Sequence, residues 1–419
     1  MDKKPKKMVP EVRFKGFTDD WEQRKFSNVF KKSKEKNDLS YSKSQVISVA
    51  NMTWSNAPET STNKYMKTYN VVHLGDIVFE GHKNKMNQFG RFVENTIGDG
   101  IVSHIFDVYK PKTLKYHDLN FWKYYINSEK VMRNTLRMST TSARMMHNLV
   151  SKDISKQLIK VPSFEETKKI GSLINKIDRF ISLQQKKLEQ LKLLKKAMLQ
   201  QLFVSDKNNL VPNIRFSGFN SSWKQRKFET LLLPKNGIRR GPFGSALRKD
   251  SFVPKSEESY AVYEQRNAIY NKFDVRYYIS SQKYNQLSNF HLHTNDVIMS
   301  GAGTIGKLAK VPLSFKKGVY NQALIRFQVN KGIDVNYFLF FMKTPQMQKQ
   351  LTEANPGSAM VNLVPMKELK KWDVIIPSKD EQIKIASLII KVDRLLSLQQ
   401  SKINQLLALK KYMLQKLFI

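Results

Sequence analysis

Two motifs occur twice in this sequence, and the repetition restricts the chain to folds built from two similar halves. The segment from Val9 to Phe26 returns as Val211 to Phe228, with 11 of 18 positions identical. The segment from Pro162 to Phe203 returns without gaps as Pro377 to Phe418, with 26 of 42 positions identical. Repeats this far apart indicate an internal duplication and a molecule with pseudo-two-fold symmetry. The stretches between the repeats differ from each other.

The longer repeat has the pattern of a coiled-coil helix. Its apolar positions alternate four and three residues apart, from Ile170 to Leu202 and from Ile385 to Leu417. A period of about 3.5 residues kept over about 40 residues predicts a rod roughly 60 Å long. Two ordinary amphipathic core helices are the alternative. Since the chain has two such segments, we expect them to pair with each other, and the symmetry makes the pair antiparallel.

Polar residues mark the start and the middle of both predicted helices. Ser163 and Ser378 are each followed three residues later by glutamate, as in a capping box. Gln184 and Gln399 interrupt the apolar seam near its centre. We predict that these two amides hydrogen-bond across the axis and fix the helix register. The alternative is that both glutamines lie at a solvated edge and have no such role.

The rest of each half reads as an α+β domain of about 160 residues. The first half predicts strands over residues 45–49, 76–79, 90–93 and 104–109 and a helix over 119–135. The second half predicts strands over 260–263, 296–299 and 323–327 and a helix over 337–351. We therefore expect a first domain over 1–161, a spacer helix over 162–205, a second domain over 206–376 and a second spacer helix over 377–419.

The charge points to a polyanionic partner. Lys plus Arg is 72 and Asp plus Glu is 35, which gives a formal net charge of +37 spread along the chain. A solvated basic surface is the alternative, but this surplus favours nucleic acid. The lack of cysteine predicts a cytosolic compartment. No signal peptide and no apolar run long enough to span a bilayer is found, so we expect no membrane association.

No catalytic motif stands out in the sequence. Residues 301–306 read Gly-Ala-Gly-Thr-Ile-Gly, but a second strand ending at Pro312 is expected to follow, where a dinucleotide site needs a helix. We predict a glycine-rich hairpin turn there, one that allows close approach of a phosphate. The sequence also lacks a Walker A motif, a GxSxG motif, an HExxH motif and a CxxC pair. We expect a binding protein rather than an enzyme, with no metal site.

The alternation of variable domain and long helix resembles the DNA-specificity subunit of type I restriction–modification enzymes. Three phrases carry the resemblance: residues 241–245, residues 295–306, and residues 357–363 with 377–386. The first domain keeps Gly75 to Phe79 but has Glu80-Gly81-His82-Lys83 where a Gly-Thr-Ile-Gly turn would be.

The resemblance implies a non-catalytic subunit in which each domain reads one half of a split double-stranded DNA target. It also implies that the helices set the spacing of the halves and carry two modification (methyltransferase) subunits. Those subunits would use S-adenosylmethionine, and added restriction subunits would use ATP and Mg, so no cofactor is expected in this chain. The alternatives are a non-catalytic RNA-binding scaffold and a fusion carrying its own methyltransferase, which the missing motifs oppose.

Candidate DNA contacts are basic and polar residues at turns, since arginine can bind guanine edges and lysine can bind phosphates. For each of them a solvated surface cation is the alternative. The candidates are Lys83, Lys85, Gln88, Arg91, Arg133, Arg137 and Arg144 in the first domain, and Arg239, Arg240, Arg248, Thr304 and Lys307 in the second.

Overall fold

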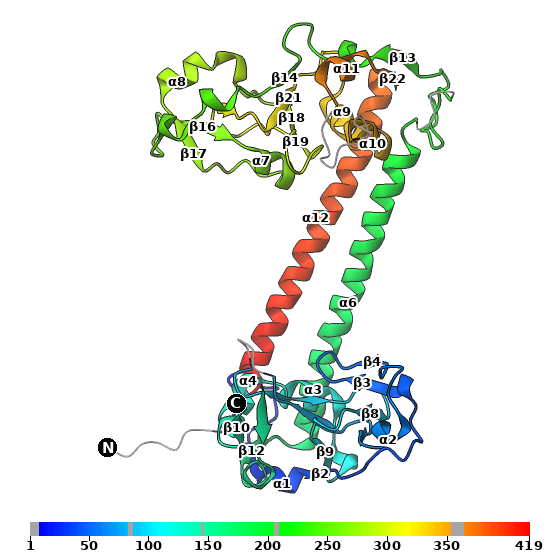
Figure 1. Cartoon of the computed structure of the whole chain (residues 1–419), viewed down its shortest axis with the longest axis vertical. Helices are drawn as coiled ribbons and strands as arrows, with labels where there is room; N and C mark the ends of the chain where they lie inside the picture. Colours follow the sequence, from blue (N-terminus) through cyan, green and yellow to red (C-terminus); the bar gives the residue numbers. More distant parts are fainter. Residues whose placement is uncertain (1–7, 83–86, 144–145, 205–208, 353–363) are drawn as a thin grey trace. The chain divides into compact units, whose positions relative to one another are not determined.

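The computed structural model describes residues 8–82, 87–143, 146–204, 209–352 and 364–419. The chain forms two compact units: residues 1–186 with 400–419, and residues 187–399 (Figure 1). The C-terminal 20 residues therefore belong with the N-terminal part of the chain. No helix in the described part of the chain is long and apolar enough to cross a membrane.

The first unit contains two four-stranded sheets with short helices around them. One sheet has the order β2-β9-β6-β7 and the other the order β4-β3-β8-β5, while β1 pairs with β12 and β10 with β11. The strands are β1 (Glu22–Lys25), β2 (Phe30–Lys32), β3 (Val46–Ser48), β4 (Thr53–Ser55), β5 (Asn70–Val72), β6 (Ile77–Glu80), β7 (Arg91–Glu94), β8 (Gly100–Val102), β9 (Val108–Pro111), β10 (Thr140–Ser142), β11 (His147–Leu149) and β12 (Leu158–Val161). The helices are α1 (Phe26–Val29), α2 (Asn63–Met66), α3 (Leu119–Tyr125), α4 (Glu129–Arg137) and α5 (Ser151–Ile154).

The second unit also has two four-stranded sheets. Its first sheet has the equivalent strand order, while in its second sheet the fourth strand lies at the other edge. Its orders are β14-β21-β18-β19 and β15-β17-β16-β20, and β13 pairs with β22. The strands are β13 (Lys224–Lys227), β14 (Ile238–Arg240), β15 (Phe252–Val253), β16 (Tyr260–Tyr263), β17 (Tyr277–Ile279), β18 (Val297–Ser300), β19 (Leu308–Lys310), β20 (Gly318–Tyr320), β21 (Leu324–Phe327) and β22 (Asp373–Ile376). The helices are α7 (Gln265–Tyr270), α8 (Ser281–Gln286), α9 (Val335–Met342), α10 (Pro345–Thr352) and α11 (Met366–Lys371).

The equivalence of the two units extends to strand direction. In each unit the first sheet is antiparallel throughout, and the second sheet contains one parallel pair, β3 with β8 or β16 with β20. The expected α+β fold with an internal repeat is therefore confirmed, although the stretches between the sequence repeats differ.

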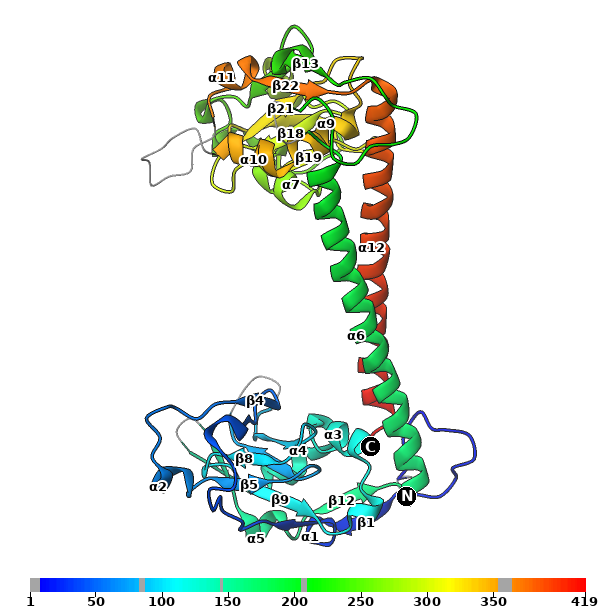
Figure 2. The same ribbon diagram turned by 90° about the vertical axis from the view of Figure 1, so that its right-hand side faces the viewer.

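The two predicted spacer segments form the longest helices, α6 (Phe164–Gln201) and α12 (Lys379–Lys416), which Figure 2 shows as two continuous ribbons. Within each unit a part of α6 lies against a part of α12. In the first unit Ile170 and Ile174 share a core with Leu417, and in the second Met198 shares a core with Ile389. The beginning of one helix thus meets the end of the other, so the helices pair antiparallel within both units, as expected.

In each unit the shorter repeat segment hydrogen-bonds to both long helices. In the first unit the Val12 N–H donates to the Lys416 carbonyl at the end of α12, at 3.1 Å. The neighbouring Arg13 donates from Nε and Nη2 to both carboxylate oxygens of Glu166 in α6, at 2.8 and 2.9 Å.

The second unit repeats these contacts residue for residue. The Ile214 N–H donates to Gln201 at 3.0 Å, and Arg215 donates twice to Glu381 at 2.8 Å. The Ser163 hydroxyl does accept the Glu166 N–H at 3.3 Å, as the capping box predicts. The Glu166 side chain is instead engaged by arginine.

The end of each long helix is also buried in a domain core. Phe418, after α12, meets Phe121 and Tyr125 of α3 edge-on, each at 5.7 Å between ring centroids. Its repeat equivalent Phe203, after α6, stacks on Tyr337 of α9 at 5.3 Å. Each domain core therefore includes the end of a helix that begins in the other half of the sequence.

Three predicted elements differ from the structure. The helix expected over 119–135 is two helices, because Ser128 begins α4 as its N-cap. The helix expected over 337–351 is also two, because Pro345 begins α10 and disfavours a helical conformation at the residue before it. The strand expected over 104–109 begins only at Val108, since residues 104–106 form a turn.

Candidate nucleic-acid interface

The candidate residues of the second unit gather at one edge of the β14-β21-β18-β19 sheet. Both β14 and β18 run antiparallel to β21, so the two strands point the same way and their following turns meet at that edge. The Gly241 N–H donates to Leu324 at 2.9 Å, and the Gly301 N–H donates to the neighbouring Ala323 at 2.8 Å. We call residues 241–248 with 301–307 the second-unit edge.

The glycine motif of this edge forms a hairpin turn between β18 and β19, as the sequence predicts. The Ser300 hydroxyl donates to the Thr304 carbonyl at 2.5 Å and accepts the Lys307 N–H at 3.0 Å. Gly303 and Gly306 have φ of 61° and 77°, which disfavours side chains there. No helix opens after the motif, so the dinucleotide-binding geometry is excluded for these residues.

Arg240, directly before the first turn of the edge, bonds to the second turn and to the connection between β20 and β21. Its Nε donates to the Gln322 carbonyl at 3.0 Å, and its Nη2 donates to the Gly301 carbonyl at 3.2 Å. The guanidinium of Arg239 lies over the Phe290 ring at 5.5 Å and also contacts Asn236. The structure therefore gives both arginines intramolecular contacts that hold the edge in shape. Arg248, Thr304 and Lys307 are exposed on the same edge.

In the first unit the equivalent hairpin joins β6 and β7, and its candidate residues meet α4. Arg133 of α4 donates to the Gln88 side chain at 2.8 Å. Arg91 donates to Glu80 at 2.6 Å and to the Ala50 carbonyl at 2.7 Å, so it braces the hairpin. Arg137 is exposed at the end of α4. Lys83, Lys85 and Arg144 lie outside the described residues.

A buried carboxylate precedes the first strand of each hairpin, at the end of that strand far from the turn. Asp76, before β6, accepts the His73 N–H at 2.9 Å, and Asp296, before β18, accepts the His293 N–H at 2.8 Å. Burial raises the pKa of Asp76 to about 6 and also raises the pKa of Asp296. The sequence analysis did not name these two aspartates as site residues, although both halves share a His-x-x-Asp spacing before a strand that could have identified them.

The two seam glutamines differ in their surroundings. Gln399 is buried, with 8% of its surface exposed, and Gln184 is partly buried. Neither side chain therefore lies on a fully solvated face of its helix. Their predicted contact across the axis stays a prediction.

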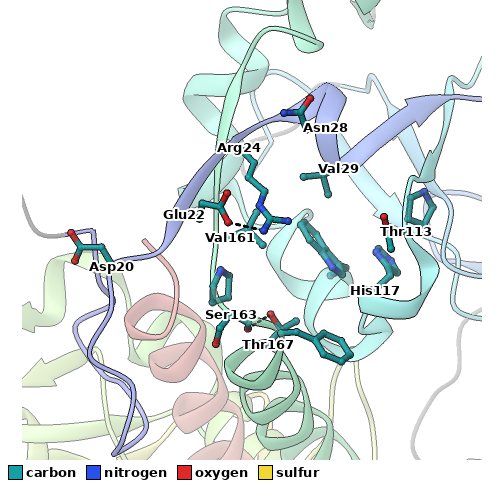
Figure 3. Close-up of a pocket in the computed structure, with 14 residues that line it drawn as sticks. Asp20, Glu22, Arg24, Asn28, Val29, Thr113, His117, Val161, Ser163 and Thr167 are labelled. Carbon is teal, nitrogen blue, oxygen red and sulfur yellow. Dashed lines mark hydrogen bonds and ion pairs between the residues drawn. The ribbon is translucent and has the colours of Figure 1, made fainter.

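The first unit also has a cavity of about 500 Å³ beside the start of α6 (Figure 3). Its hydroxyl groups serve the helix: Ser163 accepts the Glu166 N–H, and Thr167 donates to the Ser163 carbonyl at 2.9 Å. His117 in its wall stacks on Trp122 and contacts Glu94 at 2.5 Å.

Burial governs the protonation of that histidine–glutamate pair. It lowers the pKa of His117 to about 4 and raises the pKa of Glu94, so burial shifts both groups toward their neutral forms. None of the candidate DNA-binding residues lines this cavity.

No candidate metal site is found in the part of the chain that the structure describes. It contains no group of three or more His, Cys, Asp or Glu residues placed to hold an ion. The site residues that the structure describes are cations, amides, hydroxyls and glycines at turns. Such groups bind phosphates and base edges.

Comparison with known proteins identifies the family of this chain. The family model for the type I restriction modification DNA specificity domain matches residues 18–193 and 244–408. The fold resembles the S subunit of a type I restriction–modification system from M. genitalium, with 12% identity, a TM-score of 0.53, and coverage of 98% of this chain and 99% of that one.

Two further solved structures share the fold. The HsdS subunit from Thermoanaerobacter tengcongensis is 13% identical, with a TM-score of 0.53 and coverage of 95% and 96%. A chain from a structural study of complex assembly and conformational transition of the type I R-M system is 14% identical, with a TM-score of 0.59 and coverage of 99% of both chains. The family matches span most of the sequence, and this chain belongs to the type I restriction modification DNA specificity family.

Proposed function

We propose that this chain reads a bipartite double-stranded DNA target, one half with each unit. Membership of the family makes it a non-catalytic, sequence-specific DNA recognition subunit. The observation that supports two separate half-sites is that the sheets β2-β9-β6-β7 and β14-β21-β18-β19 have equivalent strand orders but carry different turns. The second unit presents Gly-Ala-Gly-Thr-Ile-Gly between β18 and β19, and the first presents a longer, more basic segment between β6 and β7. One framework with two sets of turn residues suits two different sequences.

The same proposal assigns roles along the chain. Residues 1–161 and 206–376 are the target-recognition domains, and residues 162–205 and 377–419 are the spacers. The candidate contacts to DNA are those at the two equivalent edges, with Lys307 and Thr304 in the second unit and Gln88, Arg133 and Arg137 in the first. Arg91 and Arg240 act by holding their hairpins.

The spacer helices are proposed to carry two modification subunits. Leu183 on α6 and its repeat equivalent Leu398 on α12 are 60% and 61% exposed, and Phe180 and its equivalent Leu395 are 41% and 49% exposed. An apolar surface that occurs twice in one chain suits a partner that binds in two copies. Restriction subunits would join the complex through those partners.

The cofactors belong to the partners in this proposal. S-adenosylmethionine, ATP and Mg would be used by the modification and restriction subunits, and this chain would bind none of them. Its place of action would be the cytoplasm, where the DNA is.

Methylome sequencing tests the proposal directly. A host lacking other methyltransferases would express this chain with the modification subunits encoded beside it. We expect a methylated motif of two short defined sequences separated by an unspecified gap. A second strain would carry the chain with residues 301–307 replaced by another turn of equal length. It should change one half of the motif and leave the other half and the gap unaltered. A continuous motif, or changes in both halves, would contradict the proposal.

A further inference from the structure

The second-unit edge carries an exposed aromatic ring as well as polar groups. Phe243 is 80% exposed, more than any other aromatic residue that the structure describes. Burying a phenylalanine side chain away from water is favourable, so this position has a hydrophobic contact to gain. A single exposed apolar residue is ordinary on a protein surface, and the surroundings of this one carry the argument.

The turn that presents Phe243 is well fastened. The Gly241 N–H bonds to Leu324, and the Ala246 N–H bonds to the Phe243 carbonyl at 2.8 Å. A Cβ atom at Gly241 would lie 1.9 Å from the Asn321 carbonyl oxygen, so only glycine allows the chain to pass there. Pro242 is buried beside it. The ring therefore projects from a fixed position.

Exposed cations lie on the same turn as the ring and on the neighbouring hairpin. The next residues include the exposed Arg248 and Lys249, and Arg240 ties this turn to the glycine hairpin with its exposed Thr304 and Lys307. With a chain charge of +37, the partner that meets this edge is a polyanion. Duplex DNA offers an apolar ring two apolar targets, the stacked faces of the bases and the methyl groups of thymine.

We propose that Phe243 inserts its ring between two stacked base pairs of the half-site read by the second unit. Apolar wedges of this kind unstack a base step and kink the duplex, and the flanking cations hold the displaced phosphates. The inference rests on the proposed function and adds an asymmetry to it. The segment after the equivalent strand β2, residues 33–40, contains no aromatic residue, so we expect no such insertion from the equivalent turn of the first unit.

The experiment uses the complex of this chain with its modification subunits and duplexes that carry its methylated motif. Each adenine of the motif is replaced in turn by 2-aminopurine, whose fluorescence rises when it is unstacked. With the native chain we expect the fluorescence to rise by roughly several-fold, as when one base step is unstacked. The rise should occur at one position, in one half-site only. Phe243→Ala should abolish that rise and weaken binding by about 10-fold or more. Phe243→Leu, which keeps an apolar wedge, should preserve much of both.

Leu313 gives a matched control because it is 84% exposed on the same unit and follows β19. Val297 pairs with Lys310 and Met299 pairs with Leu308, so Leu313 lies beyond the sheet end opposite to the glycine hairpin. Leu313→Ala should change neither fluorescence nor affinity.

The possible outcomes separate insertion from the other roles of an exposed ring. Unchanged fluorescence and affinity in Phe243→Ala overturn the insertion. Loss of modification subunits from the complex, with fluorescence kept, would assign the ring to a protein contact instead. If the methylated motif is continuous, the bipartite proposal fails, yet the same scan along that motif still decides whether Phe243 inserts.

Discussion

Asp178 on α6 and Lys410 on α12 form an ion pair of 2.5 Å in the first unit. Their repeat equivalents, Asp393 and Lys195, form an ion pair of 2.5 Å in the second. Lysines at apolar seam positions thus find carboxylates on the facing helix. In the first unit the Tyr124 hydroxyl of α3 also donates to Asp178, which ties the domain to the helix pair.

Exchanging the charges of the first pair tests its contribution. Asp178→Lys places two cations together and should lower the Tm, while the double variant Asp178→Lys/Lys410→Asp should recover most of the loss. Because both side chains are about a quarter exposed, we expect a coupling of about 1 kcal/mol in a double-mutant cycle. Thermal unfolding at low and high salt is the measurement. Additive effects of the two single variants would show that the pair does not contribute.

The Arg13–Glu166 contact should be the stronger one. Glu166 is 1% exposed, so Arg13→Ala leaves a buried carboxylate without its cation and should destabilise by about 3–5 kcal/mol. Arg215→Ala should cost a similar amount through Glu381. The paired replacement Arg13→Met/Glu166→Leu should be less harmful than Arg13→Ala alone.

Arg24 is the matched control for that measurement. It pairs with Glu22 on the exposed strand β1, and its loss should cost less than about 1 kcal/mol in urea unfolding. Equal effects of Arg13→Ala and Arg24→Ala would show that burial does not govern these pairs.

The sequence predicted those parts of the fold that local pattern controls. Alternation located β3, β6, β7, β9, β16, β18, β19 and β21, which are fewer than half of the described strands, and the period of the apolar positions located α6 and α12. The Arg13–Glu166 pair joins residues 153 apart in the sequence, and nothing local signals it. Turn residues supplied the candidate DNA contacts, but their structural roles depend on contacts across the sheet. Arg240, which is predicted to contact DNA, also bonds to the Gln322 and Gly301 carbonyls, and no local pattern signals those bonds. The exposed Phe243 was overlooked.

Asp76 should make stability depend on pH. The folded chain keeps this proton up to a pKa of about 6, whereas the unfolded chain releases it near the ordinary value of 3.8. Ionisation therefore favours the unfolded state as the pH rises between these values. Asp76→Asn can still accept the His73 N–H and does not ionise. The free energy of unfolding of this variant should nearly equal that of the native chain at pH 3.5. At pH 7 it should be higher by about 1–3 kcal/mol. A constant difference across this range would rule out ionisation as the cause.

Lys307 and Arg240 should affect DNA binding in different ways. Lys307 is exposed beside the glycine hairpin, so Lys307→Ala should weaken all sequences alike and lower the salt slope by about one. Arg240→Ala releases both turns and should reduce discrimination between the correct and an altered second half-site. Titrations at several salt concentrations, with both duplexes, separate the two effects. An unchanged slope for Lys307→Ala would remove it from the phosphate contacts.

Gln184 and Gln399 are predicted to fix the register of the long helices. A buried amide in an apolar seam lowers stability and selects the one alignment in which its hydrogen bonds are made. Replacing both with leucine should give a folded chain, with a Tm equal to or above the native value. Its helices can then slip by a heptad. The methylated motif should then show the same two half-sites with more than one gap length. Gln185→Leu/Gln400→Leu is the matched control, since both of these neighbours are exposed, and it should keep a single gap. A single gap in the Gln184→Leu/Gln399→Leu variant would mean that the apolar seam alone sets the register.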